Sequence, residues 1–131
     1  MPATTISRPS KPTARNETPS LSPAKSLDHD KLRAILFAGR FEWRKHVLQR
    51  LAERGIRQAS VVEVLLRGER IEDYPDDRPY PSALFFGMAE GKPLHAVAAL
   101  DETDEWAYVI TVYEPDLEHF EADYKTRRKG T

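Results

Sequence analysis

Residues 82–113 read SALFFGMAEGKPLHAVAALDETDEWAYVITVY, and this stretch decides the fold. It contains three runs of aliphatic, aromatic and β-branched residues, which are typical of strands. A Glu-Gly turn separates the first two runs and a short acidic loop separates the last two. Connections this short favour antiparallel neighbours in a meander. The three predicted strands are Ser82–Met88, Pro93–Leu100 and Trp106–Tyr113.

Upstream of this stretch the pattern changes to helices. Glu69–Tyr74 predicts one further strand, and the proline-rich link that follows it cannot be a central strand. Before it, apolar residues recur at helical spacing, and Gly55 and Gly68 are natural helix stops. Helices are predicted over Lys31–Phe37, Phe41–Arg54 and Ala59–Leu66. The expected class is therefore α+β, with N-terminal helices packed on one face of a four-stranded antiparallel meander sheet.

Residues 1–26 differ in composition from the rest of the chain. They are rich in Pro, Ser and Thr and hold five of the ten prolines, with few large apolar side chains. Such a segment cannot bury enough apolar surface to offset the entropy lost on ordering. We predict a disordered tail over residues 1–26, followed by one domain over residues 27–131. A nucleic-acid-tethering arm and a transit sequence are the alternative interpretations of the tail.

Composition limits the classes of function. The chain has 131 residues, a formal net charge of −1 and no cysteine, which excludes disulfide and thiolate chemistry. The near-zero charge means that nucleic-acid binding would have to come from local clusters. No apolar run reaches the roughly 18 residues of a membrane helix, so a cytoplasmic protein without membrane contact is expected. No calcium-loop, phosphate-loop or zinc-ligand spacing occurs, so no metal or other cofactor is expected.

A basic stripe lies on the second predicted helix. His46, Arg50 and Arg54 are spaced i, i+4, i+8 and form a row beside the apolar arc. Like charges in register repel one another unless an anion lies over them, and a phosphate would satisfy both arginines. The alternative is an ordinary surface network with nearby glutamates. The stripe is a candidate phosphate-binding site.

His95 is a second candidate. It shares a strand face with apolar neighbours, where a polar side chain needs a partner or a solvent-lined cleft. One interpretation is a structural histidine that is fully hydrogen-bonded. The other pairs it with His46 as general acid and general base, since imidazole titrates near neutral pH.

Polar and aromatic side chains on the strands complete the candidate site. Thr111 and Tyr113 share one face of the last strand, and Tyr80 lies in the proline-rich link. Thr111 could bind a phosphate oxygen, and either tyrosine could stack on a base. Cross-strand packing is the alternative for each residue.

Five motifs recur together in a recognisable order: HVLQRLAERGI (46–56), Gly68 with IEDY (71–74), YPS (80–82), GKPLH (91–95) and ITVYEPD (110–116). The sequence resembles the bacterial domain-of-unknown-function family 4258 over about residues 41–129. Val47 replaces the alanine usual at its position in the family helix, and the helix before Phe41 lies outside the usual family length.

This resemblance implies a fold similar to the barnase, EndoU, colicin and RelE-like toxin ribonucleases. It further implies the toxin half of a bacterial type II toxin–antitoxin pair, beside a small zinc-finger antitoxin of the YgiT or MqsA type. In that interpretation His46 and His95 are the catalytic acid and base of an endoribonuclease that needs no metal. The residues that would then contact the RNA substrate are Arg50, Arg54, Tyr80, Thr111 and Tyr113.

Two hypotheses therefore remain open at the level of sequence. A ribonuclease needs both histidines and the arginines to converge in one accessible cleft. A non-catalytic binding module of the same fold, either a degenerate toxin or a nucleic-acid adaptor, would have histidines that are apart or buried. The positions of His46 and His95 in the fold discriminate between them.

Overall fold

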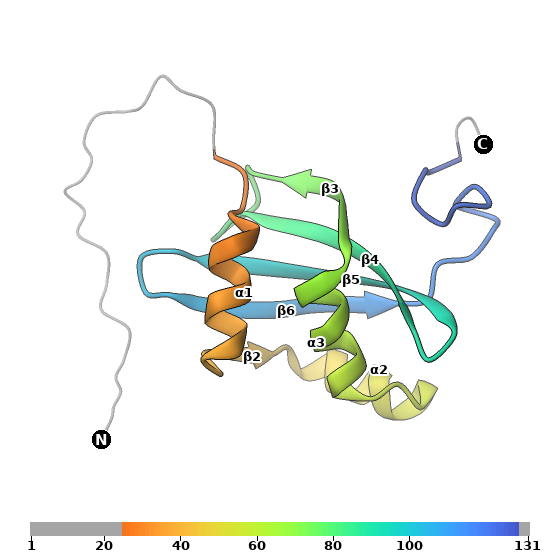
Figure 1. Ribbon diagram of the computed structural model, residues 1–131, viewed down its shortest axis with the longest axis horizontal. Coiled ribbons are helices and arrows are strands. Elements are labelled where there is room, and N and C mark those ends of the chain that lie inside the picture. The colour runs from red at the N-terminus through yellow and green to blue at the C-terminus, as the bar shows by residue number, and fades with distance from the viewer. Residues whose placement is uncertain (1–24, 129–131) are drawn as a thin grey trace.

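The computed structural model describes residues 25–128 and contains three helices and a five-stranded sheet (Figure 1). The predicted α+β class is confirmed. The disorder predicted for residues 1–26 falls almost entirely outside the described residues. The helices are α1 (His29–Phe37), α2 (Lys45–Arg54) and α3 (Gln58–Arg67), and the strands are β2 (Phe41–Trp43), β3 (Glu69–Tyr74), β4 (Ser82–Ala89), β5 (Lys92–Asp101) and β6 (Trp106–Tyr113).

The sheet has the strand order β2-β6-β5-β4-β3. The meander from β3 to β6 is antiparallel throughout, as predicted. The prediction of only four strands was wrong, because β2 adds a fifth strand that runs parallel to β6. Residues 41–43 were predicted as the start of a helix, yet Phe41 and Trp43 are strand-forming aromatics that pair with β6 instead. The helix begins only at Lys45.

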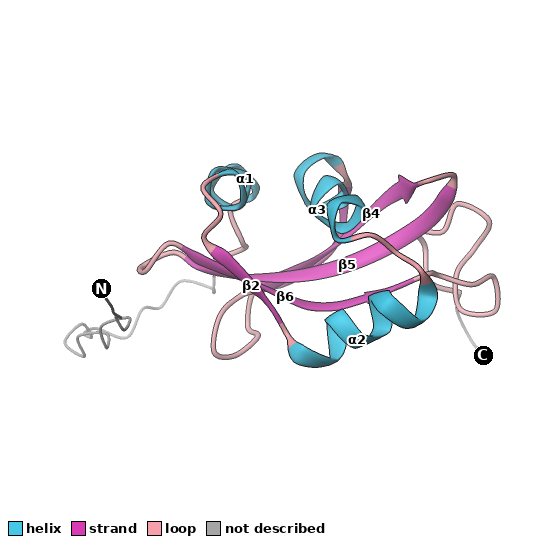
Figure 2. Cartoon of the chain, turned by 90° about the horizontal axis from the view of Figure 1, so that it is seen from below, coloured by secondary structure: helices cyan, strands magenta, loops and turns pink. Residues whose placement is uncertain are grey.

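The helices lie on two sides of the sheet. Figure 2 shows α1 and α3 on one side, whereas α2 runs along the β6 edge, displaced toward the other side. The expectation that all helices cover one face was therefore wrong. Arg44 alone joins β2 to α2, and its backbone N–H donates to the Val109 carbonyl at 3.1 Å. Because this connection is so short, α2 must continue along β6. Helix α2 ends at Gly55, as predicted. The φ of 69° at Gly55 is the left-handed conformation that glycine adopts at the end of a helix.

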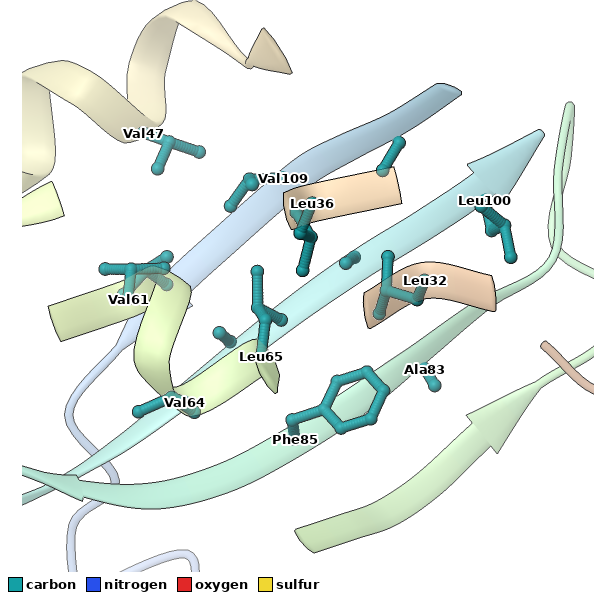
Figure 3. Packing of buried hydrophobic residues seen from close by; sticks show 14 of the residues in the cluster. Leu32, Leu36, Val47, Val61, Val64, Leu65, Ala83, Phe85, Leu100 and Val109 are labelled. Carbon is teal, nitrogen blue, oxygen red and sulfur yellow. The ribbon is translucent and has the colours of Figure 1, made fainter. Parts of the chain in front are cut away.

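The hydrophobic core lies between the sheet and the α1/α3 layer. Figure 3 shows Leu32 and Leu36 of α1 and Leu65 of α3 lying over the sheet, together with the Phe85 ring of β4. Gly87 lets α3 approach closely, because a Cβ at this position would lie 3.1 Å from a methyl group of Val64. Val47 of α2 joins the same cluster from the β6 edge.

The opposite side of the sheet, called here the distal face, is where most of the candidate residues lie. Strand register arranges its side chains in three rows that cross the sheet. The pairing register with β6 shifts between Val97 and Ala98. As a result Ala99 pairs with Tyr108, which completes the third row. Residues 114–128 cover one end of the distal face, and the link between β3 and β4 covers the other. The rows are Phe86, His95 and Tyr113; Glu72, Leu84, Val97 and Thr111; and Tyr74, Ser82, Ala99 and Tyr108.

Candidate functional site

His95 is sealed beneath the C-terminal residues. Its side chain is 0% exposed, and the rings of Phe86, Tyr113 and Phe120 meet it edge-on. Nε2 lies 2.6 Å from the Tyr124 carbonyl oxygen, which can only accept, so Nε2 carries the proton. In the neutral ring, Nδ1 then accepts from the Tyr113 hydroxyl at 3.1 Å. Burial lowers the pKa of His95, so the ring is neutral at physiological pH.

A charged group lies beside this histidine on the distal face. Arg127 donates to the two carboxylate oxygens of Glu72, from Nε at 2.6 Å and from Nη2 at 3.2 Å. The Tyr74 hydroxyl also donates to Glu72. Burial works to raise the pKa of Glu72, but hydrogen bonds from Arg127 and Tyr74 outweigh it and the pKa is lowered. Burial and the Glu72 carboxylate raise the pKa of Tyr74 to about 12.

An aromatic group occupies the other end of the distal face. The rings of Tyr80 and Tyr108 are stacked, with centroids 5.7 Å apart and planes 3° apart. The guanidinium carbon of Arg44 lies 5.1 Å from the centroid of Tyr108. Thr111 is half-buried between this group and Tyr113. Tyr80 is thereby held against the sheet although it belongs to a loop.

The predicted basic stripe is on the surface of α2. His46, Arg50 and Arg54 are all exposed. Arg54 reaches Glu114 at 3.9 Å, a long and exposed ion pair. Within residues 25–128, His46 and Arg50 make no side-chain hydrogen bond or ion pair. A small cavity of about 100 Å³ lies at the end of α2, and its lining includes Arg54, Lys92, Glu90 and Glu114 together with apolar residues.

The predicted residues therefore form two groups. Tyr80, His95, Thr111 and Tyr113 share the distal face, and the stripe on α2 borders it along β6. The two histidines do not meet: His46 lies in the first turn of α2, two residues after Arg44, whose N–H contacts Val109, whereas His95 pairs with Tyr113 at the far end of β6. The burial and the two hydrogen bonds of His95 match the interpretation of this residue as a structural histidine.

Sequence reasoning missed several residues of this region. Arg44 and Tyr108 were not singled out, and neither were Glu72 and Arg127. The strand alternation of Glu72 with Tyr74 was a usable signal, because both had to share a face. Nothing in the sequence indicated that Arg127 would return to a strand 55 positions earlier.

One group of potential metal ligands lies in the C-terminal segment. Asp116, Glu118 and His119 place their ligand atoms within 4.8 Å of one another, and all three are exposed. His119 Nδ1 is already 2.9 Å from the Asp116 carboxylate. This cluster is separate from both groups of candidate residues, and no step is assigned to it.

Comparison with known proteins places the chain in a family. The model of the domain of unknown function DUF4258 matches residues 43–114, more than half of the 131-residue chain. The match runs from the end of β2 to the residue after β6. The protein belongs to this family. No curated protein and no solved structure matches significantly. In the described part of the chain, no helix is long and apolar enough to cross a membrane.

Proposed function

We propose that this protein is an RNA-binding module that holds single-stranded RNA along α2 and the adjoining part of the distal face. The observation that carries the proposal is the charge of residues 40–57. They contain six Arg or Lys residues and two Glu residues, a formal charge of +4 in a chain whose net charge is −1. All six cations are exposed; Arg54 and Arg57 pair with Glu114 and Glu90, whereas Arg44, Lys45 and Arg50 make no ion pair within residues 25–128. Clustered, accessible cations of this kind attract the phosphate backbone.

Aromatic side chains beside the cations favour a single strand over a duplex. Arg44 lies over Tyr108, a buried ring that stacks on the half-buried Tyr80, so Arg44 and Tyr80, rather than Tyr108, are the groups that a base can reach. Unpaired bases stack on such surfaces, with gains of roughly 1–3 kcal/mol per base. Arg50, with no ion-pair partner among residues 25–128, is free to take a phosphate with its planar donors.

The burial of His95 supports binding rather than cleavage. A general acid or base must reach the proton that it transfers, and both ring nitrogens of His95 are engaged beneath the C-terminal segment. Metal-independent RNA cleavage by His46 and His95 stays a prediction, as do the toxin role, the RelE-like or barnase-like likeness and the zinc-finger antitoxin. A non-catalytic RNA-binding module is therefore the function that we propose.

Fluorescence anisotropy with a labelled single-stranded RNA tests the proposal. We expect Arg50→Ala to weaken binding and to reduce the slope of log K against log salt by about 0.7, the loss of one single-strand phosphate contact. Arg67→Ala is the matched control, because it removes an exposed helical arginine from α3 on the other side of the sheet. Equal effects of both variants, or no RNA binding by the wild type, would overturn the proposal.

The same RNA, incubated with the protein with and without EDTA and then run on a gel, tests cleavage. Intact RNA is expected in both reactions. Products that persist in EDTA and disappear in His46→Ala would restore the ribonuclease hypothesis.

A further inference from the structure

The residues around Arg127 form a site built for a guanidinium group. Glu72 accepts from Nε and Nη2 in a two-pronged arrangement, which matches the planar fork of an arginine side chain. The ring of Phe120 lies 5.0 Å from the guanidinium carbon. The Tyr74 hydroxyl fixes the carboxylate by donating to it. The Glu72 carboxylate is only 24% exposed, whereas Arg127 is 53% exposed, so the carboxylate is the more enclosed of the two.

The acceptor side and the arginine come from different parts of the chain. Glu72, Tyr74 and Tyr113 all lie within residues 43–114, which match the family model. Arg127 and Phe120 lie in the segment beyond it. The enclosed carboxylate with its two neighbouring phenols therefore belongs to the family domain, and the C-terminal segment supplies the cation that neutralises it.

A backbone contact accompanies the guanidinium. The segment also presents the Tyr124 carbonyl to His95 at 2.6 Å. Phe120 and Arg127 are joined by a β-bridge, so the segment docks as a folded-back peptide with one arginine and one aromatic anchor. This occupant is thus a polypeptide and not merely a cation.

We propose that Glu72, Tyr74 and Tyr113 form a recognition site for an arginine-bearing peptide, which residues 119–128 of the same chain fill as an internal ligand. A partner protein that presents an arginine can take the place of Arg127. Such an exchange lifts the segment from His95 and exposes the covered end of the distal face. This inference is independent of RNA binding, because it concerns the other end of that face.

The test uses the full chain with Arg127→Met, which removes the guanidinium and keeps an aliphatic side chain beside Phe120. The probe is a peptide with the sequence of residues 119–128, HFEADYKTRR, titrated while the NMR signals of the His95 and Tyr113 rings are followed. We expect saturable binding that is at least tenfold tighter to Arg127→Met than to the wild type. Lysine in place of the arginine at peptide position 127 should remove most of that binding.

Two controls make the result specific. Lys125→Met removes the other ion pair between this segment and β3, the 3.1 Å contact of Lys125 with Glu69, and should bind the peptide no better than the wild type. Adding Glu72→Gln to Arg127→Met should abolish binding. If Arg127→Met does not fold, Arg127→Gln is the second variant, and the same tenfold difference is expected.

The outcomes against the proposal are equally defined. Equal binding of the arginine and lysine peptides would show that shape or general charge governs the contact. Binding that survives Glu72→Gln would place the peptide elsewhere. N-acetylarginine amide that binds as tightly as the peptide would make the ligand a small guanidinium compound. Each of these results overturns the inference.

Discussion

The hydroxyl of Tyr113 lies 3.1 Å from Nδ1 of His95 and donates to it, while Nε2 of the same ring donates to the Tyr124 carbonyl. The two contacts tie β5 to β6 and to the C-terminal segment through one neutral imidazole. A histidine held in this way joins elements of the fold, and the proposed RNA-binding surface lies elsewhere, on α2 and the adjoining part of the distal face.

Replacing His95 with alanine should destabilise the protein. The change leaves the Tyr113 hydroxyl and the Tyr124 carbonyl without their partner and creates a cavity, with an expected loss of about 2–4 kcal/mol. Tyr113→Phe removes only one hydrogen bond and should cost about 1 kcal/mol. Urea denaturation of both variants measures the difference. A His95→Ala protein as stable as the wild type would contradict the structural role.

The stability of the fold should fall in mild acid. Burial lowers the pKa of His95 and of His29, whose Nε2 donates to the Leu65 carbonyl at 2.8 Å. The unfolded chain therefore binds these protons at higher pH than the folded protein does. The contribution of the two histidines to the free energy of unfolding is complete above pH 6.5, the ordinary pKa of histidine. It is lost as the pH falls below that value.

Urea midpoints measured at pH 7.5 and at pH 5.5 check this expectation. His95→Gln should show a smaller decrease than the wild type, because one of the two titrating groups is gone. An identical decrease in both proteins would assign the acid sensitivity to other groups.

Gly68 should not tolerate a side chain. A Cβ at this position would lie 2.4 Å from the Val64 carbonyl oxygen and 2.5 Å from that of Phe86, and neither backbone atom can move freely. We expect Gly68→Ala to lower the melting temperature by several degrees, equivalent to about 2–3 kcal/mol. Gly55→Asn is the control, since nothing lies within 4 Å of its Cβ and asparagine accepts a left-handed conformation. A Gly68→Ala protein as stable as Gly55→Asn would refute the close approach of α3 to β4.

The long strands could be predicted from the sequence because each carries its own pattern of strand-forming residues between turn signals. The strand at Phe41–Trp43 could not, because three residues ahead of an amphipathic helix give no period, and their partner in β6 lies more than 60 positions away. The same limit applies to the site. Thr111 and Tyr113 could be placed on one face by alternation, whereas the partners of His95 include a backbone carbonyl, which leaves no trace in the sequence.

The side of the sheet on which α2 packs could not be predicted from the sequence either. Helical periodicity identified the buried arc and the basic stripe of α2, yet gave no information on which side of the sheet the helix packs. In the structure α2 follows β2 after the single residue Arg44, and Arg44 lies over the ring of Tyr108.

An NMR titration of the full-length protein with single-stranded RNA tests the proposed RNA-binding surface most directly. Backbone amide shifts should be largest along α2, at Arg44 and Tyr80, and should reach Thr111. The amides of α1 and α3 should stay unchanged, since both helices lie on the other side of the sheet. Shifts that cluster on α1 and α3, or a spectrum that RNA leaves unchanged, would contradict the account.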